Sequence, residues 1–138
     1  MTSSCPTIQD IESLLTFKTY LDVDYDNLSE CIQEDLMYVD YTGWIAELVD
    51  ELIRKPWVDV EYSAERSKQL LEDESLLASA SLSDIKMVLT FLARRDRFSA
   101  GSFGMAIESG DMRKIFYRLE VISNDMGGHH SSAALVFS

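Results

Sequence analysis

Apolar residues recur at helical spacing along most of the chain, and this pattern limits the fold more than any other feature of the sequence. The clearest case covers residues 44–53, where apolar side chains occupy the i, i+3, i+4 and i+7 positions of one helix face. Only two prolines and six glycines interrupt the 138 residues, and no segment shows the alternating pattern of a competing strand. The sequence therefore predicts an all-α fold, a compact single-domain bundle of five to seven helices.

Capping signals predict where the helices begin. Three pairs resemble capping boxes: Thr7 with Asp10, Asn27 with Glu30, and Ser81 with Asp84. They predict helices over residues 8–21 and 28–39, and a third that starts near residue 82. Pro56 ends the helix over residues 44–53, because the residue before a proline is disfavoured in the helical region.

The chain is expected to be one helical domain over residues 1–123, followed by a flexible C-terminal tail over residues 124–138. The tail carries His129 and His130, the only histidines, and adjacent residues lack the spacing of a metal-ligand pair. No cofactor or metal is predicted. No segment reaches the ~18 apolar residues of a transmembrane helix, and the N-terminus lacks the pattern of a signal peptide. We therefore expect a cytoplasmic protein.

Acidic residues are concentrated in the N-terminal part of the chain. Residues 1–84 hold 19 acidic and 5 basic side chains, whereas residues 85–138 hold 5 acidic and 7 basic ones, for a net charge of −12. Such a field repels nucleic acid and anionic membranes and attracts basic surfaces. The candidate partner-binding residues are Asp22, Asp24, Asp26, Glu30, Glu34, Asp35, Asp40, Tyr41, Glu47, Asp50 and Glu51.

This charge pattern favours a small acidic, non-enzymatic module that binds a basic protein surface. In its sharpest form, the hypothesis is a nucleic-acid mimic, in which rows of carboxylates stand in for phosphates. Such a protein would inhibit a basic nucleic-acid-binding or nuclease complex, as an anti-CRISPR protein of a phage or mobile element does. The alternative is an acidic face that only keeps the protein in solution. No catalytic constellation is present, so an enzyme is not expected.

The acidic spacing Asp22-x-Asp24-x-Asp26 imitates the first ligands of a calcium loop. The sixth position, however, is Asn27 instead of glycine, and the twelfth is Gln33 instead of a bidentate glutamate. The spacing therefore predicts a solvated acidic turn rather than a calcium site.

The C-terminal half contains a distinctive block. Arg95-Asp96-Arg97-Phe98 is followed by Gly101, then by a short segment that ends at Gly110, and by Arg118-Leu119. This block, with the upstream segment 38–53, resembles the bacterial domain-of-unknown-function family 6508 over roughly residues 38–119. It departs from that pattern at Asp96, where glutamate is usual, and at Ser99, where cysteine is common. The resemblance implies a helical fold and no established activity.

Two roles for this block remain open. In the structural role, Arg97 pairs with Glu108 and fixes the angle between two helices, while Gly101 and Gly110 form turns. In the alternative role, the basic residues Arg94, Arg97 and Arg113, near the turn that holds Glu108, bind a small anionic ligand. A homodimer with a contact through Trp57 and the neighbouring apolar residues is a third possibility.

Overall fold

The computed structural model describes residues 5–23, 31–34, 39–96 and 99–126. The elements are α1 Ile8–Leu15, α2 Lys18–Val23, β1 Ile32–Glu34, β2 Val39–Tyr41, α4 Gly43–Leu52, α5 Ala64–Glu72, α6 Glu74–Ala78, α7 Leu82–Arg95, α8 Ser102–Glu108 and α9 Asp111–Met126. The fold is compact and mostly helical, with one small antiparallel hairpin, so the predicted fold class is confirmed. Within the described residues, no helix is long and apolar enough to cross a membrane.

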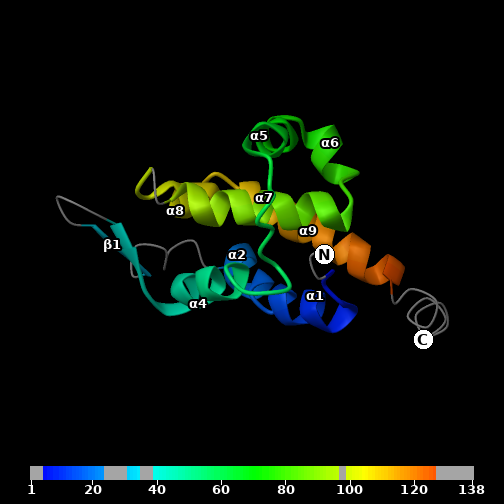
Figure 1. Ribbon diagram of the computed structural model, residues 1–138. Coiled ribbons are helices and arrows are strands. Elements are labelled where there is room, and N and C mark those ends of the chain that lie inside the picture. The colour runs from blue at the N-terminus through cyan, green and yellow to red at the C-terminus, as the bar shows by residue number, and fades with distance from the viewer. Residues whose placement is uncertain (1–4, 24–30, 35–38, 97–98, 127–138) are drawn as a thin grey trace.

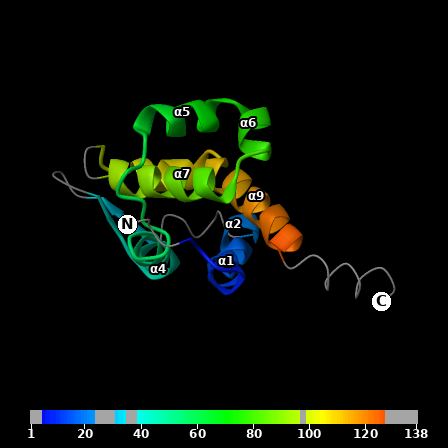
Figure 2. The same cartoon turned by 45° about the vertical axis from the view of Figure 1, so that its right-hand side comes forward.

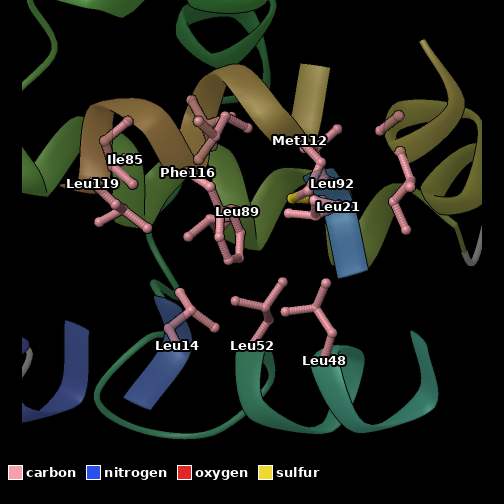
Figure 3. Close-up of a cluster of buried hydrophobic side chains, with 14 of the residues drawn as sticks. Leu14, Leu21, Leu48, Leu52, Ile85, Leu89, Leu92, Met112, Phe116 and Leu119 are labelled. Atoms are coloured by element: carbon pink, nitrogen blue, oxygen red, sulfur yellow. The ribbon is translucent and has the colours of Figure 1, made fainter. Parts of the chain in front are cut away.

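The helices pack on both sides of a central pair, α7 and α9. Helices α5 and α6 lie on one side of this pair, and α1, α2 and α4 lie on the other (Figures 1 and 2). Figure 3 shows Leu14 of α1 and Leu48 and Leu52 of α4 facing the leucines and Phe116 of the central pair. These side chains are fully buried. The apolar stripes predicted from the sequence therefore meet in one shared core.

The predicted capping boxes explain where two helices begin. Thr7 and Asp10 exchange hydrogen bonds at the start of α1, and Ser81 and Asp84 do the same at α7. The first helix is nevertheless shorter than predicted. The Thr16 hydroxyl donates to the carbonyl of Ser13, and the chain makes a tight turn before α2 begins at Lys18. A threonine hydroxyl that bonds the preceding turn competes with helix continuation.

The described part of one predicted helix, from Ile32 onward, forms a hairpin instead, while the predicted capping box of Asn27 and Glu30 lies outside the described residues. We expected residues 28–39 to be helical, but Ile32–Glu34 pair with Val39–Tyr41, so that Ile32 lies opposite Tyr41. Ile, Val and Tyr fit a pleated surface well, and here tertiary packing decides between the two structures. A Cβ added at Gly104 of α8 would meet Ile32 at 3.0 Å and Tyr41 at 3.5 Å, so the hairpin lies directly against that helix.

A buried threonine anchors the connection between α4 and α5. The Thr90 hydroxyl of α7 accepts the backbone N–H of Asp59 at 2.9 Å and lies 3.2 Å from the carbonyl of Trp57. Trp57 is fully buried against the core. Trp57 itself is therefore not available for a dimer contact, whereas a contact through the neighbouring apolar residues stays a prediction, since Ile53 and Val60 are exposed. At the other end of the chain, α9 continues to Met126, three residues past the predicted domain boundary at residue 123.

Candidate binding surfaces

The family-like block forms a hydrogen-bonded clasp between the hairpin, α7 and α8. The Tyr41 hydroxyl donates to Oδ1 of Asp96 at 2.7 Å and accepts the N–H of Gly104 at 3.1 Å. The same oxygen of Asp96 accepts the N–H of Phe103 at 3.0 Å. The first N–H groups of a helix have no partner within the helix. Asp96 and Tyr41 therefore satisfy the N-terminal end of α8 and tie the hairpin to it.

The environment of Tyr41 keeps its hydroxyl protonated. Burial raises the pKa of Tyr41 well above its ordinary range, and the hydrogen bond to the Asp96 carboxylate adds to this effect, although the Gly104 N–H opposes it. A protonated hydroxyl can donate to Asp96 at neutral pH. Tyr41 therefore has a structural role in the clasp, and its place in the predicted partner-binding surface stays a prediction.

Glycines with left-handed backbone begin and end the short helix of this block. Gly101, immediately before α8, has a φ of +89°, and Gly110, immediately before α9, has a φ of +93°. Both conformations favour glycine, as the structural interpretation of the block expects. The predicted Arg97–Glu108 pair stays a prediction, because Arg97 lies outside the described residues. Glu108 is exposed at the last position of α8.

The outer face of α4 presents a group of carboxylates. Glu47 and Asp50 are exposed and Glu51 is partly exposed, whereas Trp44 and Leu48 on the opposite face are buried. Residues three and four apart share a helix face, so these three acidic residues form one surface, which we call the α4 acidic face. Arg54 lies 3.8 Å from Asp50, and both side chains are about two-thirds exposed.

The structure places the other predicted acidic residues only in part. Asp40 is exposed on β2, opposite Gln33, and one of its carboxylate oxygens accepts the N–H of Tyr41. Asp22 lies in α2 and Glu34 lies in β1. Four residues of the predicted surface lie outside the described residues: Asp24, Asp26, Glu30 and Asp35.

The described arginines of the predicted anion site have partners in different parts of the fold. The guanidinium of Arg94 lies 5.9 Å from the ring centre of Tyr62, just before α5. Arg113 donates to the carbonyl of Leu21 in α2 at 2.7 Å. Since α5 and α2 lie on opposite sides of the central pair (Figures 1 and 2), the two arginines do not form one site.

A comparison with protein families agrees with the block and extends it. DUF6508, a family of unknown function, matches residues 9–125. The chain belongs to DUF6508. The match begins well before residue 38, where the resemblance seen in the sequence began, and it includes α1, α2 and the hairpin. No curated protein and no solved structure matches the chain.

The sequence of this DUF6508 protein shows the residues of the clasp, but it does not show that Tyr41 and Asp96 form a hydrogen bond. Asp96 is the acidic residue between two arginines in the family-like block, and nothing in that pattern indicates its partner. Tyr41 is 55 residues away, so only the fold brings the two side chains together. A second acidic surface was also missed. Exposed acids lie before and along α5, at Glu61, Glu65 and Glu72.

Proposed function

We propose that this DUF6508 protein is a small, non-enzymatic binding module that docks its α4 acidic face on a basic surface of another protein. The observation that carries the proposal is the exposure of Glu47, Asp50 and Glu51 along one face of a helix whose other face is fixed in the core. The helix backbone keeps the Cβ atoms of these residues at constant spacing. Such an array suits a partner with several cations at matching spacing.

The electrostatics of the chain support this mode of binding. A net charge of −12 steers a cationic partner towards the protein from distances up to the Debye length, about 8 Å at physiological salt. The Arg54–Asp50 pair is exposed and separated by 3.8 Å, so a cation of the partner can replace it at little cost. Association should therefore be fast at low salt and weaker at high salt.

In the sharper form of the proposal, the partner surface normally holds nucleic acid. Duplex DNA carries about one negative charge per 1.7 Å of helix axis, so a competitor needs closely spaced carboxylates. Among the described residues, the α4 acidic face and exposed Asp40 supply such carboxylates, and the sequence has further acids at positions 22, 24, 26 and 30. An inhibitor of a basic nucleic-acid-binding or nuclease complex, such as an anti-CRISPR protein acting in the cytoplasm, is the function that fits such a mimic.

Affinity capture from a bacterial lysate, with and without nuclease treatment, tests the proposal. The test variant reverses the α4 acidic face (Glu47→Lys, Asp50→Lys and Glu51→Lys). The control variant makes the same change in net charge on the other side of the molecule (Glu61→Lys, Glu65→Lys and Glu72→Lys). We expect the wild type and the control to capture one basic nucleic-acid-binding protein that high salt releases, and the α4 variant to lose it.

Two outcomes would contradict the proposal. Equal capture by the α4 variant and the wild type would mean that the α4 acidic face is not the contact surface. Equal loss by both variants, with unchanged melting temperatures, would mean that only net charge matters and that no defined surface binds. Nuclease treatment separates a direct protein contact from one that nucleic acid bridges.

A further inference from the structure

A groove between α6 and α9 has the composition of a small-molecule site. Its volume is about 300 Å³, at the lower end of the range for such sites. Leu77 and Ala78 of α6 line one wall, and Tyr117 and Val121 of α9 line the other. Leu77 is buried, whereas Tyr117 and Val121 are 47% and 46% exposed, so the groove has an apolar floor and accessible apolar sides.

Basic side chains lie around this apolar groove. Lys114 and Arg118 lie one helical turn apart on α9 and line it. The ammonium of Lys18 lies 4.8 Å from the ring centre of Tyr117. The chain as a whole has a net charge of −12, so a local group of three basic side chains is unusual in it. It is complementary to an anion and opposite in charge to the α4 acidic face.

The two cations that line the groove differ in their partners. Lys114 forms an ion pair with Glu74, and this hydrogen bond raises the pKa of Lys114 and lowers that of Glu74. The pair occupies one part of the groove. Arg118 uses its Nε–H to donate to the carbonyl of Ala80 at 2.7 Å, which fixes the guanidinium in place. No carboxylate of the described segments forms an ion pair with Arg118. A guanidinium has further N–H donors in a fixed fork that fits a carboxylate.

We propose that the α6–α9 groove binds a small amphipathic carboxylate, with its apolar body against Leu77, Tyr117 and Val121 and its carboxylate on Arg118. Burial of the apolar body supplies the main favourable term, and the charge-assisted hydrogen bonds to Arg118 select the anion over a neutral ligand. This site lies apart from the α4 acidic face, so this proposal does not depend on the proposed protein partner.

Nuclear magnetic resonance titration of the ¹⁵N-labelled full chain tests this site, with octanoate as the probe and octan-1-ol as its neutral match. We expect octanoate to give saturable shifts at the amides of residues 77, 78, 117 and 121, and octan-1-ol to bind about tenfold more weakly. Arg118→Gln should weaken octanoate about tenfold and leave octan-1-ol unchanged, a difference that a purely structural role of Arg118 would not produce. Arg54→Gln, the same substitution two residues after the end of α4, is the matched control and should change neither affinity.

A second variant keeps the test decisive if Arg118→Gln does not fold. Val121→Glu places a carboxylate at a half-exposed surface position, which the fold tolerates, and should abolish octanoate binding by repulsion. Equal affinity for octanoate and octan-1-ol would overturn the proposal, and so would full octanoate affinity in the folded variants. Shifts outside the groove, or no saturable shifts at all, would overturn it as well.

Discussion

Substitution of Tyr41 by phenylalanine tests the clasp, because it removes one hydroxyl and keeps the ring. The hydroxyl donates to the Asp96 carboxylate at 2.7 Å and accepts the N–H of Gly104 at 3.1 Å. A hydrogen bond to a charged group contributes about 1.5–3 kcal/mol, and a buried donor left without a partner costs about 1–3 kcal/mol. Asp96 keeps its bond from Phe103, and water can reach the partly buried site. We therefore expect a loss of about 2 kcal/mol, less than the sum of the two terms.

Urea unfolding at pH 7 measures this loss directly as a difference in the free energy of unfolding. Tyr117→Phe is the matched control, since Tyr117 is 47% exposed, and it should change the free energy by less than about 0.5 kcal/mol. A change of less than about 0.5 kcal/mol for Tyr41→Phe, with an unchanged slope, would refute the structural role assigned to the clasp.

The raised pKa of Tyr41 adds a pH dependence to the same comparison. Above about pH 10, an unfolded tyrosine loses its proton while folded Tyr41 keeps it. The folded state then binds more protons, so the free energy of unfolding falls as the pH rises, by up to about 1.4 kcal/mol per pH unit. This contribution is fully present below pH 10 and should be absent from Tyr41→Phe. Parallel curves for the two proteins between pH 9.5 and 11 would contradict the assigned environment.

Two further predictions concern other contacts. Thr90→Val keeps the shape of a buried side chain but removes the acceptor of the Asp59 N–H. Urea unfolding should therefore show a loss of about 1–3 kcal/mol in the free energy of unfolding. A loss below about 0.5 kcal/mol would mean that water replaces the hydroxyl. Gly101→Ala and Gly110→Ala should each cost about 1–2 kcal/mol, because both glycines have a positive φ and an added Cβ would make no close contact at either site. Calorimetric melting of the two variants checks this, and a stabilised variant would contradict the backbone argument.

The sequence predicted best the helices whose signal is local. The stripe around Leu48 and the capping box of Ser81 and Asp84 depend on residues within one or two turns, and both are present in the structure. The helix prediction for the segment around Ile32 was wrong. The apolar spacing of this segment fits a helix, but its strand structure depends on packing against Gly104, more than 70 residues away. Local patterns carry no information on such contacts.

The same distinction applies to the candidate surfaces. The acidic face of α4 could be predicted, since Glu47, Asp50 and Glu51 share one helix face with an apolar stripe opposite. The structural role of Tyr41 could not, because its partner Asp96 is distant in sequence and its burial follows from the fold. The α6–α9 groove is likewise made by residues from two separate helices.

The affinity of the captured partner for three forms of the protein tests the central claim most directly. The forms are the wild type, the variant with Lys at positions 47, 50 and 51, and the control variant with Lys at positions 61, 65 and 72. Titration calorimetry at 150 mM salt should show at least about a hundredfold weaker binding for the α4 variant, since loss of charge pairs at an interface costs about 2–5 kcal/mol, and less than about threefold weaker binding for the control. Equal affinities for the two variants would contradict the account.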